Sequence, residues 1–208
     1  MKRFFALLAA IALAVGANAQ TAEEIISKMD EVMEGLEDAG LRMTMDIKIP
    51  ILGTLSTTAW SLGDKMRMEA EMMGKKIITW EDKDTEWEYN VEDKKVTIKN
   101  RDASKTSSEE ENMKMFESAT EGYDVFLKKE TADAWHIQCK KNKSNTNKDD
   151  PKTMDLVIAK GTYQPVSLST KLKGVTVTLR NLYFKVTEKE VTFNPADYPG
   201  VTIVDERK

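Results

Sequence analysis

The chain has 208 residues, a net charge of −4 at neutral pH and one cysteine, Cys139. The acidic balance argues against a nucleic-acid partner, because phosphate backbones bind basic surfaces. A single cysteine cannot form an intramolecular disulfide, so stability must come from a packed core, which a chain of this length can build. The length predicts one domain.

The N-terminus has the three parts of a secretory signal peptide. Lys2 and Arg3 precede an apolar run over residues 4–15, which ends at an Ala-Asn-Ala site over residues 17–19. About twelve apolar residues are too few to cross a bilayer, since a spanning helix needs roughly 20. We therefore expect export to the periplasm, with cleavage after Ala19.

Cleavage at this site divides the chain into a signal peptide, 1–19, and one mature domain, 20–208. A lipid anchor would require a cysteine at the cleavage site, and Gln20 stands there instead. The mature protein is accordingly expected to be a soluble monomer.

Residues 21–38 are predicted to form an amphipathic helix. Thr21 and Glu24 have the spacing of a capping box, in which each side chain binds the backbone N–H of the other residue. The apolar side chains that follow at helical spacing are Ile25, Ile26, Met29, Val32, Met33 and Leu36. One face of this helix should therefore be buried.

Beyond Gly40 the apolar period changes to two, which is typical of half-buried strands. The alternating side chains are Leu41, Met43, Met45, Ile47 and Ile49, then Met66, Met68, Ala70 and Met72, then Trp87 and Tyr89, and then Val96 and Ile98. A short helix near 107–118 should turn Met113 and Phe116 inward. Further strands are predicted at 123–130, 134–140, 153–159, 165–172, 175–184 and 201–204, which makes ten or eleven in all.

The number of strands predicts a curled sheet. Ten strands at about 4.8 Å spacing make a sheet about 48 Å wide, whereas one helix covers about 10 to 12 Å. The predicted fold is therefore α+β and mainly antiparallel: an incomplete, half-open barrel with helices over its concave apolar face. Its centre can be hollow or fully packed, and the pattern leaves both open.

Residues for catalysis or metal binding are scarce. His136 is the only histidine, and its alternation with Cys139 predicts that His136 faces solvent and Cys139 the core. The sequence has no G-x-S-x-G, H-E-x-x-H or phosphate-loop motif. The acidic run over 81–86 lacks the glycine of a calcium loop and is predicted to be a solvated hairpin. We expect no enzyme, no metal and no cofactor.

Methionine is unusually frequent, with 12 in the chain. Thioether side chains are flexible and polarizable, which suits an apolar surface that adapts to varied ligands. They also fill irregular gaps in a core. The methionine stripes are compatible with either use.

Short motifs near the C-terminus and in two upstream hairpins resemble one family. Residues 191–205 read V-T-F-N-P-A-D-Y-P-G-V-T-I-V-D, a strand that enters a proline-containing turn before Gly-Val and an acidic last strand. Residues 84–90, with Trp87 and Tyr89, and the turn after Trp60 are the other matches. In this order they resemble the periplasmic carriers of outer-membrane lipoproteins, the LolA-like proteins.

The resemblance implies an apolar cavity that holds the acyl chains of lipoproteins or lipids. It also implies membrane partners, namely an inner-membrane release complex and an outer-membrane acceptor. The implied cavity residues are Met43, Met45, Ile47, Trp60, Met66, Met68, Met72, Trp87, Tyr89, Val96 and Ile98. The implied helical lid consists of Ile25, Met29, Val32, Met33, Met113 and Phe116.

The sequence departs from the family at one point. Family carriers have an arginine before a proline after the tryptophan strand, and this arginine holds the empty cavity shut. Residues 61–65 read S-L-G-D-K, and Lys65 or Arg67 is the candidate to replace it. Two alternative functions therefore stay open: a binder of lipid or hydrophobic small molecules without membrane partners, and a non-catalytic interaction domain with a filled core.

Overall fold

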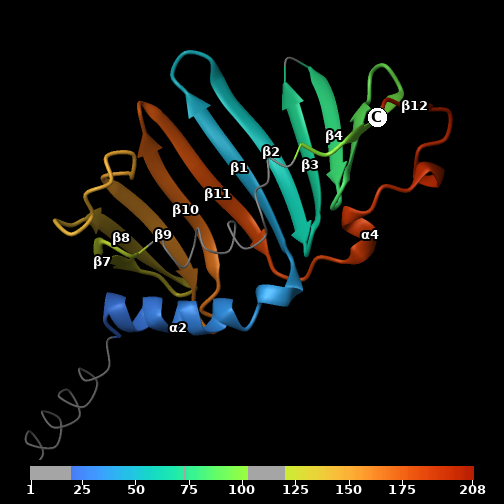
Figure 1. The fold of residues 1–208 in the computed structure, drawn as a ribbon. Coiled ribbons are helices and arrows are strands. Elements are labelled where there is room, and N and C mark those ends of the chain that lie inside the picture. Colours follow the sequence, from blue (N-terminus) through green and yellow to red (C-terminus); the bar gives the residue numbers. More distant parts are fainter. Residues whose placement is uncertain (1–19, 73, 103–119) are drawn as a thin grey trace, which may run out of the picture.

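The computed structural model describes residues 20–72, 74–102 and 120–208, which form one open twelve-stranded sheet (Figure 1). The strands are β1 (Leu41–Ile49), β2 (Gly53–Leu62), β3 (Lys65–Met72), β4 (Lys75–Glu81), β5 (Thr85–Asn90), β6 (Lys95–Asn100), β7 (Tyr123–Glu130), β8 (Ala134–Lys141), β9 (Thr153–Ala159), β10 (Pro165–Leu172), β11 (Val175–Tyr183) and β12 (Thr202–Asp205). Their spatial order is β12-β6-β5-β4-β3-β2-β1-β11-β10-β9-β8-β7.

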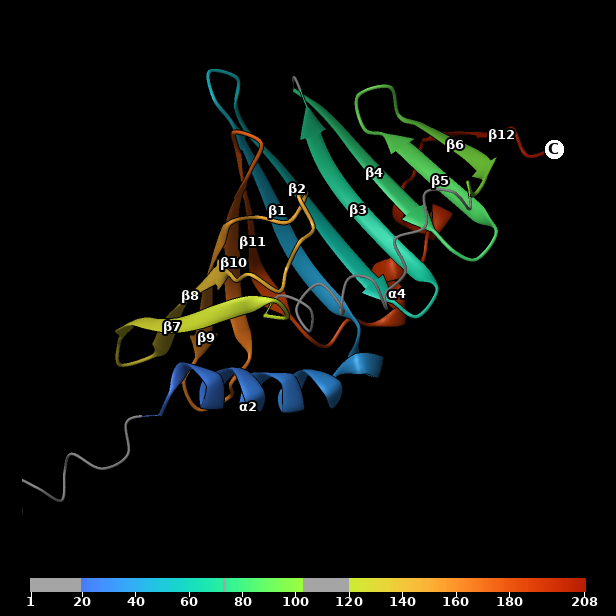
Figure 2. The ribbon, with the colours of Figure 1, turned by 60° about the vertical axis from the view of Figure 1, so that its left-hand side comes forward.

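Every strand pair is antiparallel except β12 and β6, which run parallel. The sheet curls without closing, so the predicted mainly antiparallel, half-open architecture is confirmed (Figures 1 and 2). The apolar period predicted neither β2, for which only the resemblance around Trp60 indicated a strand, nor β4. Ile77 and Ile78 are adjacent there, so the apolar residues do not alternate as they do in a strand with one buried face.

Helix α2 (Ala22–Glu34) begins at the predicted capping box. The Thr21 hydroxyl accepts a hydrogen bond from the Glu24 N–H at 3.2 Å, and the Glu24 carboxylate accepts one from the Thr21 N–H at 3.0 Å. The helix ends earlier than predicted, and a 3₁₀ turn, η1 (Glu37–Ala39), follows Gly35. The predicted helix near 107–118 lies outside the described residues.

The C-terminal segment contains α4 (Glu188–Val191) and a 3₁₀ turn, η3 (Pro195–Asp197). Thr187 and Glu190 form a second capping box, which sequence reasoning missed. The resemblance implied a strand from Val191, but α4 ends at that residue, and over 192–201, all of which the structure describes, no strand begins. Along the described part of the chain, no helix is long and apolar enough to span a bilayer.

The main core lies between α2 and the concave face of the half of the sheet that runs from β1 to β7. Register places Met45, Leu179, Leu168, Leu156 and Ile137 in one row across neighbouring strands. Ile25, Met29 and Met33 of α2 join this row with at most 1% of their surface exposed. Burial of this apolar area holds the helix on the sheet.

A second core lies on the opposite face of the other half of the sheet, under the C-terminal segment. Its aromatic cluster consists of Trp80, Trp87, Tyr89, Phe193 and Tyr198, whose ring centres lie 5.1 to 6.1 Å apart in the contacting pairs. Such tilted and offset pairs add to the stabilisation from burial. Figure 2 shows α4 beside β2 and β3, well away from α2.

Candidate functional site: an apolar cavity on the concave face

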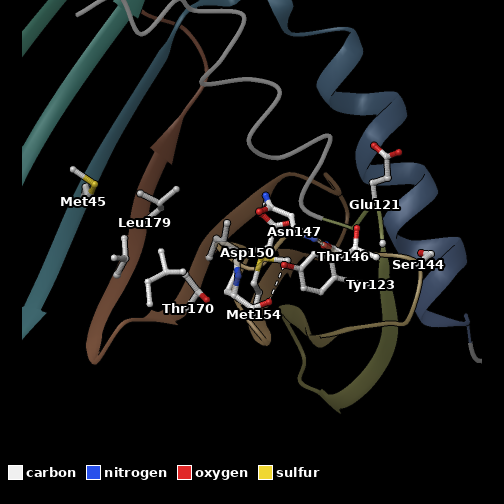
Figure 3. Close-up of a pocket in the computed structure, with 16 residues that line it drawn as sticks. Met45, Glu121, Tyr123, Ser144, Thr146, Asn147, Asp150, Met154, Thr170 and Leu179 are labelled. Carbon is white, nitrogen blue, oxygen red and sulfur yellow. Dashed lines mark hydrogen bonds between the residues drawn. The ribbon is translucent and has the colours of Figure 1, made fainter.

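A cavity of about 810 Å³ lies inside the curl of the sheet (Figure 3). Strands β1, β9, β10 and β11 form its floor, and the loop between β8 and β9 forms its rim. The lining residues are Met45, Glu121, Gly122, Tyr123, Ser144, Asn145, Thr146, Asn147, Asp150, Pro151, Met154, Leu168, Thr170, Leu172, Val177 and Leu179.

The floor is apolar because period-two stripes from neighbouring strands meet there in register. Met45 lies opposite Leu179, and Leu179 lies opposite Leu168. In the next row, Val177 lies opposite Thr170, which lies opposite Met154. Leu179, Leu168 and Met154 are only 3 to 6% exposed, so the floor is packed against the core beneath the hollow.

The rim is polar and is held by side-chain hydrogen bonds. The Asp150 carboxylate accepts one bond from the Asn145 amide at 2.8 Å and another from the Asn147 amide at 2.6 Å. Gly122 has a φ of 75°, and a Cβ there would lie 2.7 Å from the Asn145 Cβ. Because glycine has no side chain, the loop can pass close to the start of β7.

Tyr123 connects the rim to the floor. Its hydroxyl donates to the Pro151 carbonyl at 2.9 Å, and burial, with the nearby charge of Asp150, raises its pKa. The phenol therefore stays protonated at neutral pH and keeps this bond. An apolar floor under a polar rim suits an amphipathic ligand whose apolar part lies innermost.

Neither the cysteine nor the acidic residues singled out in the sequence form a reactive centre or a metal site among the described residues. Cys139 is fully buried beside Met154, and burial raises the pKa of its thiol to about 11. Among the described residues, no group of His, Cys, Asp and Glu side chains is arranged to hold a metal ion. The acidic run over 81–86 forms the predicted hairpin, in which Asp82 accepts hydrogen bonds from the backbone of Asp84 and Thr85.

The predicted cavity residues separate onto the two faces of the sheet. Those on the concave face are Met43, Met45, Ile47, Met66 and Met68. Only Met45 among them lines the cavity; Met43 packs against the main core. Met68 lies on β3, across β2 from β1, and the side chain of Met72 is outside the described part.

The remaining predicted residues point to the face under the C-terminal segment. They are Trp60, Trp87, Tyr89, Val96 and Ile98. Register explains this placement: Trp60 lies opposite Arg67, and Arg67 lies opposite Trp80 of the aromatic cluster. The structure therefore does not bring them to the cavity, and a ligand contact for them stays a prediction.

The predicted lid residues on the first helix lie in the main core. Ile25, Met29 and Met33 are buried, and Val32 is half-buried. The other two lid residues, Met113 and Phe116, fall outside the described residues. The first helix thus packs on the sheet and contributes no residue to the lining of the cavity.

Sequence reasoning missed most of the cavity floor, including Met154, Leu168, Val177 and Leu179. Their strands were predicted with nearly correct bounds, and the alternation at 154, 156 and 158 was visible in the sequence. Periodicity assigns such residues to a face, but only the long-range register shows which stripes surround a hollow.

Neither candidate for the family's gating arginine faces α2. Lys65 forms an ion pair with Glu188 of α4. The Arg67 guanidinium lies 4.8 Å from the ring centre of Trp60 and 5.6 Å from that of Trp80. Both cations therefore bind the C-terminal segment or the cluster beneath it.

The fold and the cavity define an open, helix-covered antiparallel half-barrel with an apolar hollow. Compared by sequence, the chain matches no protein-family model and no curated protein. Compared by structure, it is similar to LprF from Mycobacterium bovis, with a TM-score of 0.55 and 9% identity over 85% of this chain and 99% of that chain. This likeness shows a shared fold.

Two further solved structures are more distant. The Mycobacterium tuberculosis lipoprotein LppX has a TM-score of 0.43 and 11% identity over 75% of this chain and 90% of its own. A LolA-superfamily protein from Nitrosomonas europaea has a TM-score of 0.31 and 10% identity over 86% and 100%.

Proposed function

We propose that this protein binds an acyl chain of a lipoprotein or lipid in the concave cavity and carries it through the periplasm. The observation that supports this function is the hollow of about 810 Å³ with an apolar floor and a polar rim. Ligand pockets of this size and composition are typical of proteins that bind small apolar groups. Each methylene that leaves water contributes about 0.8 kcal/mol before the cost of ordering the chain.

The carrier role rests on the sequence. The signal peptide over 1–19 directs the chain to the periplasm, where Gln20 becomes the first residue. The resemblance of 84–90 and 191–205 to LolA-like carriers supports acylated lipoproteins as cargo. An inner-membrane release complex would then supply the cargo, and an outer-membrane acceptor would receive it.

One observation favours a second candidate, a binder of lipid or hydrophobic small molecules without those membrane partners. Lys65 and Arg67 are both engaged under the C-terminal segment, so the described residues offer no equivalent of the family's gating arginine at this position. The cavity would then hold its ligand by burial alone. No catalytic step belongs to either candidate.

A variant that blocks the cavity distinguishes the two binding functions from an interaction domain with a filled core. Val177 lines the cavity, whereas its neighbour Thr176 lies on the opposite face between Lys48 and Lys171. Val177→Trp should weaken binding of a fluorescent fatty acid by at least about tenfold, because the indole ring would occupy the space that the acyl chain needs. Titration of the purified protein measures the affinity.

Thr176→Trp is the matched control, since it adds the same side chain one residue away. It should bind the fatty acid as the wild type does, and denaturant melts should show that both variants fold. Equal affinity in the two variants would rule out this cavity as the site. A wild type that binds no fatty acid would indicate the filled-core interaction domain.

A further inference from the structure

The turn between β1 and β2 exposes apolar side chains at one end of the molecule. This turn, residues 50–52, reads Pro-Ile-Leu. Ile51 has a relative exposure of 105% and Leu52 one of 81%, and they are the two most exposed large hydrophobic residues among those described. Isolated apolar residues on a surface are ordinary, but two fully presented at the tip of a hairpin are not.

The backbone of Ile51 reinforces this point. Its φ is 73°, in the left-handed region that glycine and asparagine adopt readily and that β-branched residues avoid. Isoleucine at this position therefore destabilises the turn relative to glycine or asparagine. Folding alone does not account for an exposed, strained isoleucine, which suggests a role in contact with another apolar phase.

An apolar stripe connects this tip to the cavity. Going from the tip along β1, the side chains on the concave face are Ile49, then Ile47, and then Met45, which lines the cavity. Leu55 of β2 lies opposite Ile47 and widens the stripe. An acyl chain moving between the cavity and an apolar phase at the tip would stay in contact with apolar side chains.

Cations gather beside the tip although the chain is acidic overall. Lys48 and Lys171 are both opposite Thr176, on the same face of the sheet. Lys173 lies in the adjacent turn between β10 and β11, and its side chain is 84% exposed. Figure 1 shows this turn beside the tip.

Two acidic groups lie near these lysines. Asp149 pairs with Lys173 at 3.0 Å, and Asp46, two residues before Lys48 on the same face of β1, forms an ion pair with Arg180. Each of these carboxylates is matched by its own cation, and Lys48 and Lys171 add two further positive charges, so the surface beside the tip is positive. Exposed apolar residues flanked by lysines match the interface of a bilayer that contains anionic lipid.

We propose that the tip formed by Pro50, Ile51 and Leu52 enters the interfacial layer of an anionic lipid bilayer and docks the cavity against it. The lysines contact the headgroups, and the stripe through Ile47 and Ile49 forms the path for the acyl chain. Bilayer binding itself does not depend on the proposed cargo; only the use of the stripe rests on the proposed function.

Vesicle co-sedimentation tests the docking. The probe is phosphatidylethanolamine vesicles with and without phosphatidylglycerol, and the variant is Ile51→Asn with Leu52→Asn. Asparagine tolerates the positive φ, so the fold should be retained while binding falls by at least about tenfold. The matched control is Phe126→Asn with Val166→Asn, which removes two 44% exposed apolar residues elsewhere and should bind as the wild type does.

A polarity-sensitive label measures insertion directly. Cys139 is fully buried, so Leu52→Cys can be labelled selectively with a nitrobenzoxadiazole dye. Its emission should shift to the blue when phosphatidylglycerol vesicles are added. The same dye on Ala132→Cys, at an exposed position in the turn between β7 and β8 at the other end of the strands, should not respond.

Equal binding by the wild type and the asparagine variant, or equal shifts at both labels, would overturn the proposal. So would concentration-dependent dimers that the asparagine variant abolishes without vesicles, since the tip would then bind a second copy. The fatty-acid affinity of that variant without vesicles should be unchanged. A loss of docking is therefore distinguishable from a failure of the cavity to bind.

Discussion

At the residue scale, Arg67 shows how one side chain serves the second core. Its guanidinium lies over the rings of Trp60 and Trp80 and pairs with Glu69. Cation–π contacts of this kind contribute about 0.5 to 2 kcal/mol each, depending on how far the cation is desolvated. A lysine would keep the charge but lose the planar stacking, so the two residues are not equivalent here.

Cys139 gives a test of the strand register at the same scale. Because the side chain is fully buried and burial raises its thiol pKa to about 11, the native protein should not react with a disulfide reagent at mildly alkaline pH. Unfolding in guanidinium should release one reactive thiol per chain. Absorbance of the released thiolate measures both states, and fast reaction in the native state would contradict the burial of β8.

At the scale of elements, the C-terminal segment acts as a cover for the half of the sheet that α2 does not reach. The Thr187 capping box begins α4, Lys65 pairs with Glu188, and Phe193 contacts both Trp80 and Trp87. β12 then pairs in parallel with β6 at the edge of the sheet. The segment is thus attached by packing, an ion pair and a strand ladder.

Removing one ring from this cover should lower stability without changing ligand binding. Phe193→Ala loses contacts in the aromatic cluster, and we expect the free energy of unfolding to fall by about 2 to 4 kcal/mol. Fatty-acid affinity should be unchanged, because the cluster lies on the face opposite the cavity. Urea melts and fluorescence titrations check the two quantities.

Tyr183→Ala is a control for that variant, since Tyr183 is 46% exposed on β11 and should cost less. A large loss of fatty-acid affinity in Phe193→Ala would show that the aromatic face takes part in binding. Trp87 and Tyr89 would then regain the role that the family resemblance assigned to them.

The bounds of the strands were easier to predict from the sequence than the pairing of each strand with its neighbours in the sheet. Strands over 123–130, 153–159 and 165–172 agree with their predicted bounds because period-two patterns are local. Met68 and Trp87 both belong to such patterns, yet they lie on opposite faces of the sheet. Their faces follow from pairings between strands, which no single window of sequence contains.

At the scale of the whole molecule, the sheet has two apolar faces in different halves. One half packs α2 and surrounds the hollow, and the other half is closed by the C-terminal segment. This division explains why the sequence shows apolar stripes along almost every strand although the sheet does not close. It also leaves the concave side of β1 continuous from the cavity to the tip at Ile51.

The central claim is that an acyl chain occupies the hollow beside Val177, and photo-crosslinking tests it most directly. The wild type would be loaded with a fatty acid that carries a diazirine near its methyl end, irradiated and digested, and the labelled peptides identified by mass spectrometry. We expect label on β1, β9 and β11, around Met45, Met154 and Val177, and little label in Val177→Trp. Label concentrated on Trp87 or Phe193, or equal labelling of the variant, would contradict the account.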